Sequence, residues 1–334
     1  YKDTRMLLQA PHKVRKYQTE KKRHLKQTGQ IVNAITGDDQ PIEGTWLNRN
    51  SNKLIVIGNG FTNAREHMAP FGDLFHEYDL LFFDMRGHGF KTGRGLINYF
   101  TGVEAGTVSF GQKEHLDVKA IVDEVKRLKE YDEVVGVGLC YSALIFNKSA
   151  SIYPDLFDRI ILDGCWQSLY YTTQELAKDL GKLAAPQRHS SLKKNRIMQN
   201  RYVQKGLLKF AEMILKTEFN TVSVLDYTSN LPDIPVLFIY GKDDALIPRE
   251  QFERVWHATN APRKTAVITS APHVRNHLHL KEVYKEICTL FIENTHEDFT
   301  RLLTSPDAYM AYKSGQLQQA AGDRLSMFGE HFAG

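Results

Sequence analysis

Three residue types that can together activate a nucleophile stand at the ends of apolar runs in this sequence of 334 residues. Cys140 ends the run "EVVGVGLC", Asp244 lies in "GKDDALIP" after another run, and His273 closes "ITSAPH". A thiolate nucleophile needs an imidazole to take up and return a proton, and the imidazole needs a carboxylate to fix its tautomer. The three residues therefore predict nucleophilic catalysis, in the chain order nucleophile, acid, histidine.

Cys140 stands where a predicted strand turns into a predicted helix. Gly138 and Ser142, two residues to either side, are small enough to let this turn be sharp. A side chain at such a corner points out at the carboxyl end of the sheet, where ligands bind in open α/β folds. The N-terminus of the following helix favours a thiolate. The alternative interpretation is that Cys140 is a small buried apolar residue.

The elements that must position these residues alternate between two patterns. "QIVNAIT" and "IEGTWLN" flank a turn-rich spacer and predict an antiparallel hairpin. Continuous apolar runs, typical of strands buried on both faces, follow in "KLIVIGNG", "YDLLFFDMRG", "EVVGVGLC", "DRIILDG", "IPVLFIYG" and "KTAVITSA". Helical patterns separate them in "EHLDVKAIVDEVKRLKEY", "REQFERVWHAT" and "NHLHLKEVYKEICTLFIENT". We predict an α/β fold with a mostly parallel, doubly wound sheet and an antiparallel start.

The length favours one main domain with additions, because single cores rarely grow beyond about 250 to 300 residues. We predict a basic extension over residues 1–29, a core over 30–165 and 231–295, and a C-terminal helical tail over 296–334. Residues 166–230 lack a buried-strand pattern and predict an inserted helical cap. This cap is basic, since residues 180–211 hold eight Lys and Arg and no acid.

Charge and cysteine content limit the classes of partner and compartment. Residues 1–30 carry nine Lys and Arg against two acids, so the formal net charge of +4 is concentrated in this leader. We interpret the leader as a solvated extension; contact with an anionic membrane surface is the alternative, and no aromatic interleaving indicates a nucleic-acid partner. Three widely spaced cysteines and no bilayer-length apolar run predict a cytoplasmic protein without a disulfide framework. The first residue, Tyr1, is not a Met, so we expect a longer natural chain.

Five segments in a fixed order resemble the α/β-hydrolase superfamily: "IGNGF", "FDMRGHG", "GLCYS", "GKDDALIP" and "APH", within a pattern that covers about residues 30–295. The resemblance implies an oxyanion hole made of two backbone N–H groups. One belongs to Tyr141, after the nucleophile, and the other to Phe61, after the third strand. Such donors are each worth about 3 to 4 kcal/mol in related chemistry.

The chain departs from the family at its centre. The usual serine nucleophile is Cys140, the second glycine of the elbow is Ser142, and Asn59 replaces a common histidine. Cysteine variants of the fold include dienelactone hydrolases, thioesterases and polyester synthases. The resemblance implies an acyl hydrolase or acyltransferase with His273 as base and Asp244 as its orienting acid, and without metal or organic cofactor. The alternative is a catalytically inactive ligand-binding protein.

The expected substrate is a small-molecule acyl ester or thioester. The basic cap favours an anionic carrier, either coenzyme A or an acyl-carrier protein. Several residues keep a second interpretation: Asp243 and Asp163 as alternative acids, and Ser142 as an alternative nucleophile that we expect to pack instead. His273 and His277 lack the Glu of a zinc helix, so no metal site is predicted. Aromatic residues that either line an acyl pocket or pack in the core are Phe61, Tyr141, Trp166, Tyr170 and Tyr171.

Overall fold

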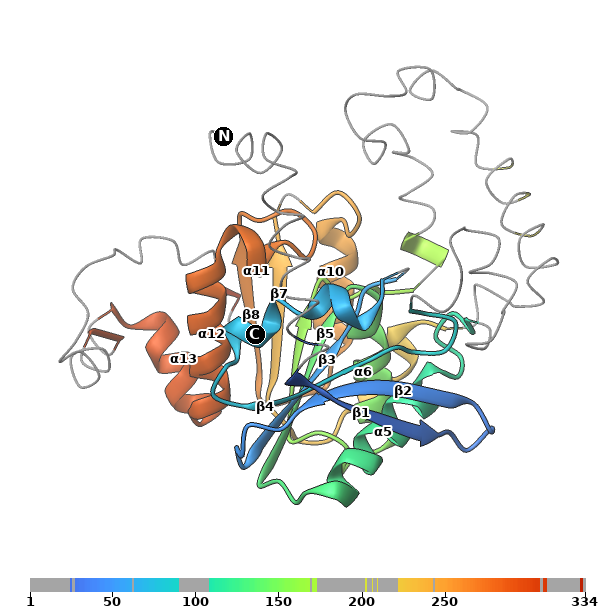
Figure 1. Cartoon of the computed structure of the whole chain (residues 1–334). Coiled ribbons are helices and arrows are strands. Elements are labelled where there is room, and N and C mark those ends of the chain that lie inside the picture. Colours follow the sequence, from blue (N-terminus) through green and yellow to red (C-terminus); the bar gives the residue numbers. More distant parts are fainter. Residues whose placement is uncertain are drawn as a thin grey trace, which may run out of the picture. The chain divides into compact units, whose positions relative to one another are not determined.

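The structure is a computed structural model, drawn in Figure 1. It describes residues 28–61, 63–89, 108–168, 170–172, 222–242, 244–306, 309–310 and 331–332, together with Leu25, Tyr202, Gly206 and Lys209. The chain divides into two compact units, Tyr1–Val108 with Leu116–Gly136, and Ser109–His115 with Val137–Gly334. Most of the predicted basic leader and the helices of the predicted cap lie outside the described residues, so both remain predictions.

The first unit contains the predicted hairpin. Strands β1 (Gln30–Ile35) and β2 (Pro41–Leu47) pair antiparallel, β2 pairs antiparallel with β4 (Asp79–Phe83), and β4 pairs parallel with β3 (Lys53–Gly58). Buried and exposed residues alternate along β1, whereas β4 is buried throughout. In β1 the buried positions are Val32 and Ala34, whereas Ile31 and Ile35 are exposed; the continuous apolar run of β4 is typical of a strand buried on both faces. Short helices η1 (Arg65–Met68) and α3 (Phe71–Leu74) connect β3 to β4.

The second unit carries parallel strands that end near the predicted catalytic residues. Strand β7 (Val236–Gly241) lies between β6 (Arg159–Asp163) and β8 (Lys264–Thr269) and pairs parallel with both. Strand β9 (His331–Phe332) adds antiparallel to β8. The helices of this unit are α6 (Tyr141–Ile152), η4 (Val224–Asp226), η5 (Thr228–Asn230), α10 (Arg249–Ala258), α11 (Asn276–His279), α12 (Lys281–Glu293) and α13 (His296–Thr304).

Two elements are divided between the units by sequence. Strand β5 (Glu133–Leu139) and helix α5 (Glu114–Leu128) each have residues in both. Together the strands confirm the predicted fold class, an α/β protein with mostly parallel strands and an antiparallel N-terminal hairpin. The helix expected over residues 276–295 is interrupted at Leu280, whose backbone leaves helical geometry at φ −126° and ψ 42°. Strand β9 was not predicted, because two residues carry no periodic pattern.

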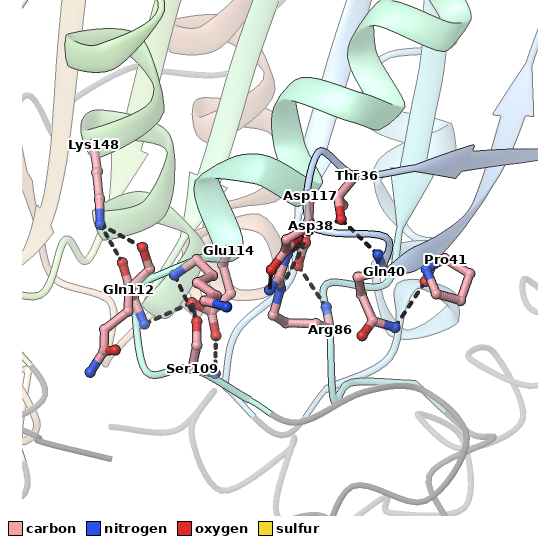
Figure 2. Close-up of polar contacts among 12 residues, drawn as sticks. Thr36, Asp38, Gln40, Pro41, Arg86, Ser109, Gln112, Glu114, Asp117 and Lys148 are labelled. Carbon is pink, nitrogen blue, oxygen red and sulfur yellow. Dashed lines mark hydrogen bonds and ion pairs between the residues drawn. The ribbon is translucent and has the colours of Figure 1, made fainter. Parts of the chain in front are cut away.

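Buried ionic groups hold the loops of each unit, and Figure 2 shows two sets of them. In the first unit, the Arg86 guanidinium donates to Asp117 Oδ1 at 2.6 and 2.9 Å and to both carboxylate oxygens of Asp38. In the second, the Lys148 ammonium donates to the carbonyls of Gly111 and Gln112 at 2.8 and 2.9 Å. These charges are bonded on several sides, as buried charges must be.

Within the described part of the chain, no helix combines the length and the apolar character needed to cross a bilayer.

Candidate active site

Cys140 occupies a strained corner between β5 and α6. Its backbone angles are φ 60° and ψ −113°, and the residue is 7% exposed. Such backbone angles store about 1 to 3 kcal/mol and persist only where surrounding contacts fix them. The Cys140 N–H donates to the Asp163 carbonyl at 2.9 Å, and the Cys140 carbonyl accepts from the Ala143 N–H at 3.2 Å. The corner is therefore held from the adjacent strand and from the helix that follows.

The small residues around Cys140 make this turn possible. A Cβ added to Gly138 would lie 2.7 Å from the Ala143 Cα, closer than real atoms approach. Ser142 is fully buried, and its hydroxyl accepts from the Leu139 N–H at 2.8 Å and donates to the Leu139 carbonyl at 3.0 Å. Ser142 thus bonds the strand end across the turn, as expected for a packing residue.

Asp244 is fixed by backbone donors in the loop after β7. Its Oδ1 accepts from the N–H groups of Leu246 and Ile247 at 2.8 and 2.9 Å, while its own N–H donates to the Gly241 carbonyl. The carboxylate side chain is fully buried. Only Oδ2 is left to meet another residue. Asp243, the alternative acid next to it, lies outside the described residues.

His273 follows β8 and meets the free oxygen of Asp244. The distance from His273 Nδ1 to Asp244 Oδ2 is 2.6 Å. The other ring nitrogen, Nε2, is buried, and the ring also interacts with the Cys140 side chain, whose hydrogen bond contributes to the raised pKa of His273. Catalytic hydrogen bonds are often loose until a substrate binds, so an imidazole with one nitrogen oriented and one available suits a general base.

The charge state of His273 is set by opposing effects. Burial acts to lower its pKa, but the charge of Cys140 and the hydrogen bond to Asp244 outweigh burial and raise the pKa to about 10. An imidazole with a raised pKa favours the protonated form beside a thiolate.

The two predicted oxyanion donors lie in different units. Tyr141 begins α6 and is buried, with its ring edge-on to Trp166 at 5.7 Å between centroids. Phe61 follows β3 in the first unit, where its ring packs edge-on against His88 at 5.9 Å. Tyr170 and Tyr171 contact each other in the second unit. Their roles in oxyanion or acyl binding remain predictions.

Two residues that the sequence did not single out contact the catalytic groups or their loop. Gly164 has φ +63°, and a Cβ there would lie 3.1 Å from His273 Cε1. Asn276 is fully buried and donates from Nδ2 to Asp163 Oδ1 at 3.1 Å. A glycine directly after the strand "RIILD" was the one available signal for the first; nothing in the sequence indicated the second.

Cys140, Cys165 and Cys288 are all free and buried. Among the described residues, no group of three or more His, Cys, Asp or Glu side chains could hold a metal ion. His277 is half-buried, and desolvation together with the charges of Arg275 and His279 lowers its pKa to about 4.

Comparisons with known proteins agree with this architecture. No protein-family model matches the chain. It is similar to the uncharacterized protein YqkD of Bacillus subtilis, with 23% identity over 259 residues that span 73% of this chain and 72% of YqkD.

Among solved structures, it is similar to the esterase Pf2001 of Pyrococcus furiosus, with a TM-score of 0.62, 23% identity and coverage of 81% and 92% of the two chains. It is also similar to the enol-lactonase of Burkholderia xenovorans, with a TM-score of 0.53, 15% identity and coverage of 79% and 100%. At these identities the likeness concerns the fold. The chain has the α/β-hydrolase fold.

Proposed function

We propose that the protein is an acyl hydrolase or acyltransferase of the esterase or thioesterase type, in which Cys140 carries the acyl group. The observation that carries the proposal is the oriented imidazole of His273. Its Nδ1 is bonded to Asp244, and its charge is coupled to Cys140. The fold neighbours support the same class, since they include an esterase and an enol-lactonase.

In the first half-reaction, the Cys140 thiolate attacks the carbonyl carbon of the substrate. The C=O bond opens to an oxyanion, which the backbone N–H group of Tyr141 would bind. As the oxyanion collapses, the bond to the leaving group breaks, and the His273 imidazolium gives its proton to the departing alcohol or thiol. An acyl-cysteine thioester and a neutral imidazole remain.

In the second half-reaction, the neutral imidazole acts as general base. His273 Nε2 takes a proton from water, giving hydrolysis, or from another acceptor, giving acyl transfer. The acceptor oxygen or sulfur attacks the thioester, and the Cys140 thiolate leaves from the second oxyanion. Asp244 stabilises the imidazolium and keeps Nδ1 protonated throughout.

The substrate class follows from the reactivity of the nucleophile and from charge. A thioester intermediate lies close in energy to a thioester substrate, so acyl carriers that end in a thiol are suitable donors. Eight Lys and Arg without an acid over residues 180–211 would attract an anionic carrier such as coenzyme A or an acidic acyl-carrier protein. KM for such a carrier should then rise with ionic strength.

The test is intact-mass spectrometry after brief incubation with a panel of activated esters and acyl thioesters of increasing chain length. We expect an acyl-sized mass gain that Cys140→Ala abolishes and the control Cys165→Ala keeps. The chain length that labels best would define the acyl specificity. No adduct and no released product with any donor would overturn the proposal and favour an inactive ligand-binding protein.

A further inference from the structure

A second carboxylate, that of Asp163, joins the nucleophile to the histidine loop. Asp163 ends β6 and is 1% exposed, and its carbonyl accepts the Cys140 N–H at 2.9 Å. Its Oδ1 accepts from Asn276 Nδ2 at 3.1 Å, and Asn276 Oδ1 accepts from the Thr269 hydroxyl at 2.6 Å. Thr269 and Asn276 bracket the loop that carries His273. Asp163 therefore bonds to the backbone of Cys140. Through the Asn276 amide it is also connected to both ends of the loop that carries His273.

The backbone directly after Asp163 lies against the imidazole. Gly164 has φ +63°, and an added Cβ would lie 3.1 Å from His273 Cε1 and 3.3 Å from Nδ1. The ring is therefore packed on the end of β6. A charge on the neighbouring Asp163 acts on the ring over a short distance in a buried environment, where screening by water and salt is weak.

The groups that face Asp163 come from four segments of the same unit. They are His273 and Asp244 from the loops after β8 and β7, Asn276 from α11, and Tyr284 and Cys288 from α12. Burial raises the pKa of Asp163, and the charge of Asp244 adds to this rise. The charge of His273 and hydrogen bonds from Asn276 and Tyr284 oppose it. The resulting pKa is about 7.

We propose that Asp163 is a positioning residue for the Cys140 and His273 pair, whose carboxylate adds a second negative charge behind the imidazole when it is ionised. This inference rests on the proposed function. Asp244 orients Nδ1 at every pH at which it is ionised, whereas Asp163 acts on the ring through its charge. When Asp163 is protonated, only the positioning through Asn276 remains.

The protonation of Asp163 gives this role a characteristic pH dependence. Below about pH 6 the carboxyl is neutral, and the imidazolium is stabilised by Cys140 and Asp244 without it. Above about pH 8 the carboxylate is charged, and it stabilises the imidazolium and so the thiolate beside it. The reactivity of Cys140 should therefore increase as the pH rises through 7.

The test is the rate at which iodoacetamide alkylates Cys140 between pH 5 and 8.5, followed by intact mass and peptide mapping. Asp163→Asn keeps the shape of the side chain and an oxygen for Asn276 but removes the charge. We expect this variant to react like the wild type at pH 5.5 and about 5- to 10-fold more slowly at pH 8, because transfer of the proton from Cys140 to His273 becomes less favourable when the imidazolium loses up to one pKa unit. The variant Asn276→Ala breaks the connection but keeps the charge; because the Asn276 amide opposes the rise in the pKa of Asp163, its loss should move the inflection to higher pH without removing it.

A ratio of wild-type to Asp163→Asn rates that is constant across the pH range would overturn the inference, because a purely structural role predicts that result. Should the variant not fold, the wild-type profile decides, since a profile with no inflection near pH 7 contradicts the proposed charge effect. Absence of alkylation at any pH would instead overturn Cys140 as the nucleophile. In that case, the pKa of His273, measured by NMR of ring-labelled histidine and assigned with His273→Gln, still tests the inference: it must fall in Asp163→Asn.

Discussion

Two buried clusters of this protein each combine one base with two acids, yet they differ in how completely they are bonded. In the first unit, Arg86 lies between Asp38 and Asp117 and donates to both carboxylates from its nitrogens. In the second unit, His273 lies near Asp244 and Asp163, but only Asp244 bonds to a ring nitrogen.

The two clusters also differ in what their charges can do. Burial acts to lower the pKa of Arg86, but the bonds to Asp38 and Asp117 raise it, so the guanidinium keeps its charge at any physiological pH. In the second cluster the pKa of His273 is raised to about 10 and that of Asp163 to about 7, and the His273 ring interacts with Cys140 as well as with Asp244. The Arg86 cluster, whose charges are bonded to one another, stabilises the fold. The His273 cluster, whose pKa values are shifted, holds a proton that the imidazole can transfer.

The largest effect on the His273 cluster is expected when Asp244, the acid that orients the imidazole, is replaced. In Asp244→Asn, the amide oxygen would still accept from Leu246 and Ile247, which turns the NH2 group towards His273 Nδ1. The imidazole would then carry its proton on Nε2 and could not act as base. We expect kcat/KM to fall by about 10³- to 10⁴-fold, measured with the ester or thioester that labels best. Thermal unfolding should stay near the wild type, and a loss of less than tenfold would remove Asp244 from this role.

Replacing Arg86 should have the opposite effect: it should lower the stability of the fold and leave kcat unchanged. Arg86→Leu leaves Asp117, which is fully buried, without its cation, and breaking a buried pair in this way lowers stability by about 3 to 5 kcal/mol. We expect this loss in urea unfolding at pH 7, with kcat of the folded fraction unchanged. A fall in kcat at full folding would show that the cluster takes part in the reaction.

The free energy of unfolding should depend on the protonation of Asp163, because its carboxyl is buried and its pKa is raised. Its folded pKa of about 7 lies above the ordinary value of 3.8, so the folded state holds this proton more tightly than the unfolded chain. Stability is therefore unaffected below pH 4, falls as the pH rises from about 4 to 7, and stays reduced above 7. Asp163→Asn removes the titration, and we expect it to be more stable than the wild type by about 2 to 4 kcal/mol at pH 8.

The measurement is chemical unfolding of both proteins at pH 4 and pH 8. The difference between them should shrink towards zero at pH 4. A variant that is less stable at pH 8 would mean that the charge of Asp163 is fully compensated in the fold, as the charges around Arg86 are.

The sequence predicted the parts of this comparison that depend on local pattern. Continuous apolar runs indicated the parallel strands, and two extended runs on either side of the turn-rich spacer "GDDQP" indicated the hairpin, because both signals lie in neighbouring residues of the chain. The strained turn at Cys140 was expected from the small residues beside it. The catalytic roles of Cys140, Asp244 and His273 stay predictions, although the 2.6 Å between the last two fits them.

What the sequence could not predict depends on contacts between distant segments. Asp163 has ordinary neighbours in the chain; burial raises its pKa, and the groups that modify this rise lie about 80 to 120 residues away. Asn276 acts through a bond to a strand 113 residues earlier. Gly164 leaves room for the imidazole of His273, which lies after a different strand. These are properties of packing, which no periodic pattern encodes.

The smallest expected effect concerns the turn itself. Ser142→Ala removes a hydroxyl that accepts from the Leu139 N–H and donates to the Leu139 carbonyl, both in a fully buried position. Leaving a buried donor unbonded lowers stability by about 1 to 3 kcal/mol, which urea unfolding would measure. The acyl adduct on Cys140 should persist, because the strained backbone is also held by the bond from Cys140 N–H to Asp163. Loss of the adduct in a folded Ser142→Ala protein would mean that this hydroxyl takes part in the chemistry. A hydrogen-bonded group next to Cys140 would then be catalytic as well as structural, and the distinction between the two kinds of group would not hold there.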